Sequence, residues 1–403
     1  MTMRVEEFDL RALPTAFFDN PYPIYRELQQ QAPIHRLADG SYLLTRYSNL
    51  RDVYRDAKRF SSDKKQQFGP VFGAESALYE HHTTSLVFND PPLHTQVRKA
   101  IGNALAEKTV FALGPGLKTL VARLLDAAEE QQSFDLIGDY AAAIPIEIIG
   151  NLLRVPATER GPLRDWSLAI LGALEVGLDE QKLAAGNRAV TEFLAYLSHL
   201  IGKRAAGLKS SDNDIVARLL RYSDKNHTLT RTELYHQCIF LLNAGHETTT
   251  NLIGNGAYLL HQHPTAIAAL RTGPERIDGA IEEVLRMESP NQLGNRTTTE
   301  EITLEGVKIP SNAILTLCIG AANRDPDVFK NPDSFEINRH PNPHLAFGAG
   351  IHTCAGLNVA RLEARVALTE LLLRFPQLRF TQPPNRAQRA RFRGFDSAPA
   401  SIN

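Results

Sequence analysis

Cysteine is scarce in this sequence of 403 residues, which contains only Cys238, Cys318 and Cys354. An odd number spread over the C-terminal half argues against a disulfide framework and indicates a reducing compartment. No pair has the Cys-x-x-Cys spacing of many zinc sites. A cysteine with a special role must therefore act as a thiol, a thiolate or a metal ligand.

An excess of charge and long hydrophobic runs are also lacking. The 44 Lys and Arg residues balance 45 Asp and Glu residues, so no global field attracts nucleic acid. The chain has no run of about 18 apolar residues, and its first residues mix charged and apolar side chains. We therefore expect neither a membrane span nor a signal peptide, and a cytoplasmic protein.

Flexible linkers, low-complexity tracts and internal repeats are missing as well. The chain is 43% hydrophobic and 22% charged, which is typical of a globular protein with a large core. We expect one domain over residues 1–403, in which a β-rich N-terminal lobe and a larger helical lobe share one core.

Periodicity predicts a mainly α fold with a small β part. Apolar residues recur at the spacing of one helical face in much of the chain. Segments with this pattern include residues 116–130, 139–155, 187–204 and 278–287. Two further segments contain hairpin turns between apolar runs. They are residues 34–45, with the turn Asp39-Gly40, and residues 302–317, with the turn Glu305-Gly306.

One predicted helix is unusually long and covers residues 231–263. Thr230 and Glu233 have the spacing of a capping box at its start, and Pro264 ends it. At 1.5 Å per residue it spans on the order of 50 Å, enough to cross the whole molecule. Its middle, residues 241–251, contains a glycine and three successive threonines, which weaken a helix. Packing alone does not require such residues there.

The segment HLAFGAGIHTCAG, residues 344–356, surrounds Cys354 with glycine and histidine. Gly348 and Gly350 permit a tight loop whose N–H groups point at the sulfur, and a helix is predicted to start beside it. Both features favour a thiolate. Gly356 leaves room for a flat ligand close to the backbone. A buried structural cysteine is the alternative, but a single thiolate ligand in such a loop indicates haem iron.

The pattern Phe-x-x-Gly-x-x-x-Cys-x-Gly is met by Phe347, Gly350, Cys354 and Gly356. It resembles the haem-ligand loop of the cytochrome P-450 superfamily, the haem-thiolate monooxygenases. The resemblance extends over nearly the whole chain in length, helix order and further motifs. It implies a P-450 fold in which haem b (iron protoporphyrin IX) lies between the long central helix and the loop and helix that carry Cys354, the iron ligand.

The long helix contains AGHETTT, which is similar to the oxygen-binding motif of that family. Ala244, Gly245, Glu247 and Thr248 occupy its positions. A hydroxyl beside a carboxylate can relay protons, so Thr248 and Glu247 are the implied catalytic pair. Gly245 is expected to let a diatomic ligand approach the helix. An inert Glu-Thr pair is the alternative for an isolated occurrence.

A third motif is Glu283-x-x-Arg286, with Arg339 further along the chain. On a solvated helix such an i, i+3 pair contributes only ~0.2–0.5 kcal/mol. The resemblance instead implies that the three charged groups lie buried together beneath the ligand loop. We therefore expect a structural role for Glu283, Arg286 and Arg339, without contact to substrate.

The haem propionates require cationic or N–H donors. By resemblance these donors are His94, Arg98, Arg296 and His352, although each alone would more often be a surface residue. The resemblance implies further cofactor contacts by residues of the two glycine-containing motifs. These are Ala244, Gly245, Phe347, Gly348 and Gly356. His344 matches a common family position, but no contact is assigned to it.

The implied reaction is insertion of one oxygen atom from dioxygen into a small, mostly hydrophobic organic substrate. The chain has no G-x-G-x-x-G loop and no cysteine cluster, so electrons must come from another protein. We expect a ferredoxin or flavodoxin with an NAD(P)H-dependent reductase. Lys99, Arg361 and Arg365 are candidates for the basic face that such a partner contacts, with solvated helix charges as the alternative.

Three other functions remain open at this point. A peroxygenase or isomerase of the same family usually replaces the acid-alcohol pair, which is present here. A noncatalytic haem sensor would need the ligand loop but not Glu247 and Thr248. A cysteine hydrolase is a poorer fit, because His352 lies only two residues from Cys354 and no third orienting group is evident.

Substrate contacts are expected from four segments by family analogy. The apolar candidates are Phe72, Val87, Phe88, Leu293 and Phe395. The polar candidates are Lys64, Gln292 and Asn295. The polar group suits a carboxylate or hydroxyl of the substrate, whereas a solvated loop is the simpler interpretation of Lys64 and Lys65.

Overall fold

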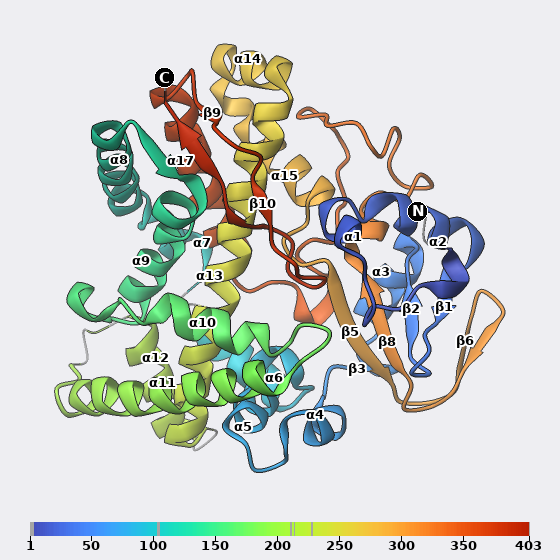
Figure 1. Ribbon diagram of the computed structural model, residues 1–403. Coiled ribbons are helices and arrows are strands. Elements are labelled where there is room, and N and C mark those ends of the chain that lie inside the picture. The colour runs from blue at the N-terminus through green and yellow to red at the C-terminus, as the bar shows by residue number, and fades with distance from the viewer. Residues whose placement is uncertain (1–3, 103–104, 210–211, 213, 227–228, 403) are drawn as a thin grey trace.

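The longest helix runs through the middle of the molecule (Figure 1). The computed structural model describes residues 4–102, 105–209, 212, 214–226 and 229–402. Within them, α13 (Arg231–Gln262) begins at the predicted capping box. The Thr230 hydroxyl accepts a hydrogen bond from the Glu233 N–H at 3.1 Å, and the Glu233 carboxylate accepts one from the Thr230 N–H at 2.6 Å. The helix ends one residue before its predicted end.

Helices make up most of the described chain, as predicted. The first group consists of the helices before residue 112 and the short α16: α1 (Thr15–Asp19), α2 (Tyr22–Gln31), α3 (Tyr47–Arg55), α4 (Lys65–Phe72), α5 (Ala77–Thr84), α6 (Leu93–Gly102), α7 (Glu107–Phe111) and α16 (Ile319–Ala322). The second group lies around α13: α8 (Gly114–Gln131), α9 (Ala143–Leu152), α10 (Leu163–Gly172), α11 (Glu180–Ala206), α12 (Ile215–Asn226), α14 (Pro264–Thr272), α15 (Ile277–Met287) and α17 (Leu357–Arg374).

The main sheet has the strand order β1-β2-β8-β5-β3. Its strands are β1 (Ile34–Arg36), β2 (Tyr42–Leu44), β3 (Phe60–Ser61), β5 (Leu293–Thr298) and β8 (Ile314–Cys318). Only the β2–β8 pair within this sheet is parallel. The smaller sheets contain β4 (Ser133–Asp135), β12 (Pro399–Ser401) and β9 (Arg379–Phe380), then β6 (Ile302–Leu304) with β7 (Val307–Ile309), and β10 (Asn385–Arg386) with β11 (Phe395–Ser397).

Both predicted hairpin turns are present. β1 and β2 pair in antiparallel fashion across the Asp39-Gly40 turn, where Gly40 has a φ of 83°. β6 and β7 pair across Glu305 and Gly306, which both have positive φ. Positive φ at two central residues is the requirement of a type I′ turn. Residues 314–317, which were predicted to extend the second hairpin, instead belong to β8 of the main sheet.

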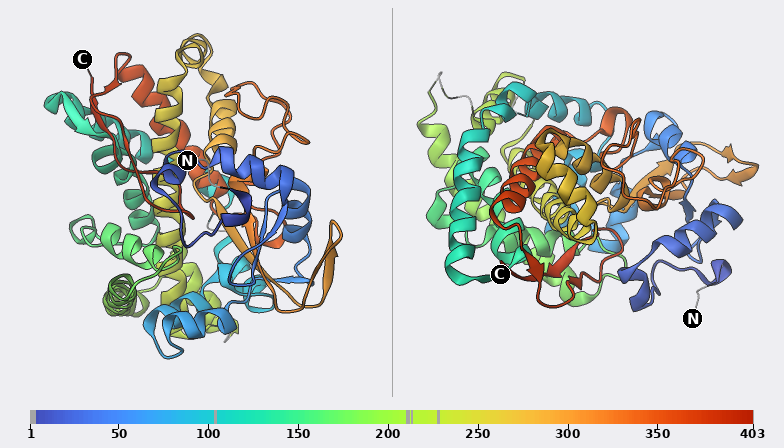
Figure 2. Two further views of the ribbon diagram at one scale, coloured as in Figure 1. Left: turned by 45° about the vertical axis from the view of Figure 1, so that its right-hand side comes forward. Right: turned by 90° about the horizontal axis from the view of Figure 1, so that it is seen from above.

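The two halves of α13 pack into different apolar clusters. Ile239 and Leu242 in the N-terminal half join a cluster with residues of α11 and α12. Leu252 and Ile253 in the C-terminal half join a second cluster with residues of α8, α15 and α17. Figure 2 shows that the main sheet lies on one side of α13 and the helices α10 to α12 on another. The centre of α13 is therefore the point where these parts of the chain meet.

Candidate active site

The loop before α17 has the conformation that its glycines predict. Gly348 and Gly350 have φ values of 65° and 71°, which side chains rarely tolerate. A Cβ atom on Gly350 would also lie 2.2 Å from the backbone oxygen of Tyr54. The Cys354 N–H donates a hydrogen bond to the oxygen of Phe347 at 2.9 Å, which closes the loop. The cysteine thus lies at the end of a rigid turn, directly before α17.

The environment of the Cys354 sulfur differs from the prediction in one respect. Burial raises the pKa of the thiol, although the Gly356 N–H and the Arg98 and Arg361 guanidinium groups act to lower it. The loop and the helix start alone therefore do not favour the thiolate, because burial outweighs them. A metal cation beside the sulfur has the opposite effect, since it stabilises the thiolate. A Cβ atom on Gly356 would have no neighbour within 4 Å, so the backbone is open on that side.

The centre of α13 has one accessible face. Ala244 is exposed and Thr248 is partly exposed, whereas His246 and Glu247 are buried. The Thr248 hydroxyl donates to the Ala244 oxygen at 2.7 Å. Ala355, which follows the cysteine, packs against the apolar cluster that contains the N-terminal half of α13. The accessible helix face and the cysteine loop thus belong to one region of the molecule.

The role predicted for Gly245, to let a diatomic ligand approach the helix, stays a prediction, and the structure adds a packing role. A Cβ atom there would lie 2.4 Å from Cδ1 of Ile149 in α9. The missing side chain therefore allows α9 to pack closely against α13.

Glu247 and Thr248 face different neighbours. The buried Glu247 carboxylate forms an ion pair with Arg389, and its Oε2 has no hydrogen-bond partner among the described residues. Burial raises the pKa of Glu247 to about 7, although Arg389 lowers it. Glu247 and Arg389 line a small cavity of about 60 Å³, together with His246 and Thr250. Glu247 and Thr248 are adjacent in sequence, but no direct hydrogen bond joins their side chains.

The four predicted propionate donors form a cluster that lacks acidic partners. The rings of His94 and His352 lie 4.1 Å apart between centroids. Both ring nitrogens of His94, and Nε2 of His352, are buried without a partner in the described part of the chain. Arg296 is buried, stacks on Tyr54 and donates to the Asn295 oxygen at 2.7 Å.

The pKa shifts in this cluster also indicate that its positive groups lack acidic partners among the described residues. Burial, followed by Arg296 and His94, lowers the pKa of His352 to about 2. Burial also lowers the pKa of Arg98 and of Arg296. No carboxylate within the described residues pairs with either guanidinium. Buried donors without partners in a positive field fit a dianionic group, and the propionates of haem have that chemistry.

The third motif forms the buried ion pairs that were expected. Glu283 and Arg286 are 0% exposed, and Arg286 donates to both Glu283 oxygens at 2.7 and 2.8 Å. Arg339 donates to the same carboxylate at 3.0 and 3.1 Å. Burial alone would raise the pKa of Glu283, but the hydrogen bonds from Arg286 and Arg339 hold it below its usual value.

Comparison with known proteins agrees with this arrangement. The Cytochrome P450 family model matches residues 179–393, more than half of the chain. The monooxygenase PikC of Streptomyces venezuelae is 37% identical over 93% of this chain and 89% of its own. The vitamin D(3) 25-hydroxylase of Pseudonocardia autotrophica is 35% identical over 94% of this chain and 91% of its own. This chain belongs to the cytochrome P450 family.

Solved structures show the same relationship. The crystal structure of P450BioI, in complex with an acyl carrier protein ligated to hexadec-9Z-enoic acid, has a TM-score of 0.90 and 32% identity, and the match covers 96% of this chain and 100% of that one. The fold, the haem b cofactor and the monooxygenase reaction predicted from the sequence are thus confirmed at the level of the family. Bacterial P450 enzymes use redox partners and small-molecule substrates, as expected here. No described helix is both long and apolar enough to cross a membrane.

His344 acquires a definite contact in this P450. Its Nε2 lies 3.1 Å from the Glu282 carboxylate, which also accepts two hydrogen bonds from Arg361 at 2.7 Å. Burial tends to raise the pKa of Glu282, but Arg361 and His344 hold it at about 2. The Arg361 guanidinium also lies over the ring of Phe347 in the cysteine loop, 4.8 Å from its centroid. These contacts brace the loop from α15 and α17.

The predicted basic face for a redox partner is weaker than expected. Arg361 is held by Glu282, and Arg365 pairs with Asp278. Lys99 is exposed and forms no ion pair within the described part of the chain. Two of the three candidates are thus already paired with acids of α15. The sequence did not reveal these ion pairs, because the partners are distant along the chain.

The predicted substrate contacts fall into separate places. Phe72 and Phe88 each lie 5.0 Å from Phe68 between ring centroids, and Val87 beside them is 38% exposed. Leu293 does not join them, because it is 1% exposed within the core cluster of the N-terminal segment.

The remaining expectations about the substrate side, for Phe395 and Lys64, have different outcomes. Phe395 lies 5.0 Å from Tyr258 between ring centroids and lines the small cavity beside Glu247, so its role as a substrate contact stays a prediction. Lys64 is buried, whereas Lys65 is exposed and pairs with Asp63. The solvated-loop interpretation therefore holds for Lys65 alone.

The residues Gln292 and Asn295 serve mainly internal contacts. Gln292 is 1% exposed and donates to the Ser289 oxygen at 2.8 Å. Asn295 accepts from Arg391 at 2.7 Å and donates to Thr316 at 3.2 Å. Neither side chain is retained as a substrate contact.

Sequence reasoning did not find Arg389, the partner of Glu247. The signal was present, because arginine recurs at residues 386, 389, 391 and 393. The sequence analysis gave these arginines no partner, whereas Arg386 and Arg393 pair with the buried Glu288 in the structure. Only the folded chain shows which acids these arginines meet.

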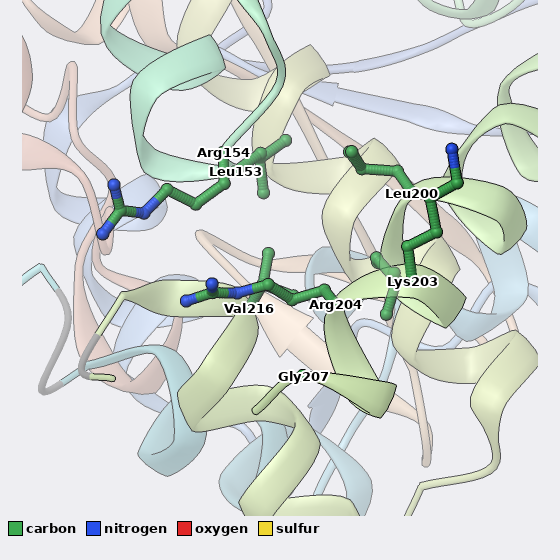
Figure 3. Close-up of a pocket in the computed structure, with 8 residues that line it drawn as sticks. Leu153, Arg154, Leu200, Lys203, Arg204, Gly207 and Val216 are labelled. Atoms are coloured by element: carbon green, nitrogen blue, oxygen red, sulfur yellow. The ribbon is translucent and has the colours of Figure 1, made fainter. Parts of the chain in front are cut away.

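A cavity of about 300 Å³ lies elsewhere, among α9, α11 and α12 (Figure 3). Figure 3 shows that Arg154 and Arg204 extend along one side of it, opposite Leu200 and Lys203. Both arginines pair with Asp214. None of the residues predicted for haem or catalysis lines this cavity.

Proposed function

We propose that Cys354 is the thiolate ligand of the haem iron in this P450. Two features support this assignment: the closed loop from Phe347 to Gly356, and the open space beside the backbone of Gly356. His94, Arg98, Arg296 and His352 bind the propionates, with His94 and His352 side by side. The observation that carries this assignment is the set of buried ring nitrogens that have no protein partner among the described residues.

Bound haem supplies the activation of dioxygen and the insertion of one oxygen atom into the substrate. The Thr248 hydroxyl holds a proton on the accessible face of α13. The Glu247 carboxyl exchanges a proton near neutral pH, because burial has raised its pKa to about 7. A water molecule must connect the two, since their side chains do not meet directly. Arg389 positions the Glu247 carboxylate.

The electron donor is a ferredoxin or flavodoxin with an NAD(P)H-dependent reductase. All three cysteines are free thiols, which suits the reducing cytoplasm where such partners work. Lys99 is the exposed cation that supports docking, while Arg361 and Arg365 contribute less because acids neutralise them.

Two measurements test this function. The carbon monoxide complex of the reduced protein should show the strongly red-shifted Soret band of thiolate ligation. An imidazole-type band in folded protein would move the ligand to a histidine. Turnover with a surrogate ferredoxin and reductase then separates a monooxygenase from a haem sensor, which would bind haem but form no product. Product formation with peroxide alone would instead indicate a peroxygenase.

A further inference from the structure

Lys64 is a buried lysine without an acidic partner in the described part of the chain. It is 4% exposed, and its Nζ donates to the hydroxyl of Thr297 at 3.1 Å. Asp63, the adjacent acid, pairs with Lys65 at 3.3 Å. A lysine is almost never fully buried unless an acid pairs with it. Asp90 and Asp63 are close enough to raise the pKa of Lys64, but neither forms an ion pair with its ammonium group.

The other nearby acid is also occupied. Asp90 accepts hydrogen bonds from the Ser61 hydroxyl at 2.5 Å and from the Ser62 N–H at 2.8 Å. These contacts hold the carboxylate beside β3, and no ion pair joins it to Lys64. The local fold thus uses both acids for other purposes.

The cations near Lys64 outweigh the acids, because Arg296 and Arg391 lower its pKa more than Asp90 and Asp63 raise it. Burial, followed by Arg296 and Arg391, lowers the pKa of Lys64 to about 7. Arg391 donates to the oxygens of Leu174, at 3.0 Å, and of Asn295, at 2.7 Å, so its own donors are satisfied. An anion placed among these groups would gain favourable interactions with all of them. It would also restore the charged form of the lysine.

The helix that follows Lys64 provides both a polar and an apolar surface. Gln67, one turn along α4, donates to the same Thr297 hydroxyl at 3.0 Å, and its buried Oε1 has no partner among the described residues. Phe68 packs on Phe88, and its ring centroid lies 5.7 Å from that of His82. An acidic head beside Lys64 would therefore continue into an aromatic environment.

We propose that Lys64 binds the carboxylate of the substrate, so that this P450 acts on organic acids with an apolar body. The inference rests on the proposed haem site and names the substrate class for that site. A propionate is the competing anion, since Arg296 is close enough to lower the pKa of Lys64. Arg296, His94, His352 and Arg98 already provide the propionates with donors, which leaves Lys64 for a further carboxylate.

The test compares acids with their neutral esters on the haem-loaded enzyme. Dodecanoic acid and biphenylcarboxylic acid are each titrated beside their methyl esters, with the haem spin-state change as the signal. Wild-type enzyme should bind at least one acid ~10-fold more tightly than its ester, as a desolvated charge-assisted hydrogen bond implies. Lys64→Met should abolish that preference. The matched control Lys65→Met removes an exposed lysine and should keep it.

Three results would overturn the proposal. One is equal affinity of the wild type for both acids and their esters. Another is an acid preference that survives in Lys64→Met. A third is faster haem loss from Lys64→Met with an unchanged preference, which would assign Lys64 to a propionate. Lys64→Gln, which keeps a polar group for Thr297, replaces the methionine variant if that variant does not fold. A wrong haem assignment would appear in the carbon monoxide spectrum instead.

Discussion

The two charged clusters next to the cysteine loop are built on opposite principles. In the cluster of Glu283, Arg286 and Arg339, each buried charge has a protein partner at hydrogen-bond distance. In the cluster of His94 and Arg296, buried donors lack acidic partners within the described chain. A saturated cluster stabilises the fold by itself, whereas an unsaturated one is complete only with a ligand.

The pKa shifts follow the same division. Next to the saturated cluster, Arg361 and His344 hold the pKa of the Glu282 acid at about 2 in spite of its burial. In the unsaturated cluster, burial and neighbouring cations lower the pKa of the His352 base, also to about 2. The first shift records charges that are already paired. The second records first the burial of His352 and then repulsion by the neighbouring cations.

The largest effect is expected when the saturated cluster loses its acid. Glu283→Gln leaves Arg286 and Arg339 buried without a counter-charge, which should lower the free energy of unfolding by about 3–5 kcal/mol. Urea denaturation measures this, and a single transition would also support the prediction of one domain. Asp278→Asn is the control, because its ion pair with Arg365 is exposed and contributes at most about 1 kcal/mol. Equal losses in both variants would contradict the comparison.

The unsaturated cluster should respond differently. Arg296→Leu removes a buried cation that has no acidic partner. The free energy of unfolding of the protein should therefore change little. Loss of a charge-assisted hydrogen bond to a propionate should instead weaken haem binding ~10–100-fold. Haem transfer to an acceptor protein measures the change, with Arg365→Leu as the control. A lower free energy of unfolding without faster haem transfer would contradict this prediction. It would mean that Arg296 stabilises the fold, as the ion pairs of Glu283 do.

A third change addresses the accessible face of α13. Thr248→Ala should bind haem normally, yet product formed per reducing equivalent should fall at least ~10-fold while peroxide rises. The hydroxyl donates to the oxygen of Ala244 one turn earlier. Thr191→Ala is the matched control, because its hydroxyl makes the same type of bond to Asn187 in α11. Unchanged product yield in Thr248→Ala would remove this residue from proton delivery.

Glu247 predicts a pH dependence of stability with a definite sign. Its pKa rises from an ordinary value near 4.5 to about 7 in the folded chain, so the folded state binds the extra proton. Stability contributed by this group is therefore present below about pH 4.5 and is lost as the pH rises through 7. Glu247→Gln should reduce the decline of the free energy of unfolding with pH. Urea denaturation at several pH values between about 4.5 and 7 measures this change. An identical slope in the variant would show that Glu247 does not titrate there.

The smallest effect concerns the surface proposed for docking of the redox partner. Lys99→Ala should slow electron transfer about 2–5-fold at low salt, since an exposed charge mainly steers association. Arg365→Ala should have less effect, because Asp278 already neutralises that cation. Stopped-flow reduction with a ferredoxin compares the two. A larger effect of Arg365 would mean that its ion pair opens when the partner binds.

Local rules explain which parts of the fold were predictable. The capping box at Thr230 and the hairpin turn at Asp39-Gly40 depend on residues that are neighbours in sequence. The tight loop before Cys354 likewise follows from glycines with positive φ. The ion pairs of Glu283 were predicted only through the family resemblance, since an i, i+3 pair alone does not indicate burial.

Contacts between distant segments explain what the sequence alone did not reveal. Gly245 is small because Ile149 of another helix packs on it, and Leu293 is buried because the N-terminal segment covers its side of the sheet. Arg389 reaches Glu247 across 142 positions of sequence. No local pattern contains such partners, because they exist only when the helices are assembled.

The amino-acid sequence alone determined where the long helix begins, where the chain turns and which cysteine lies in the glycine-rich loop before α17. These features depend on backbone conformation and on hydrogen bonds within a few residues. The tertiary structure decided which charges are neutralised and which remain without a partner. Lys64 and Lys65 are adjacent and chemically identical, yet one is buried among cations and the other is exposed beside an acid. Burial and pairing are properties of the assembled chain, and they decide which of two lysines can bind a ligand.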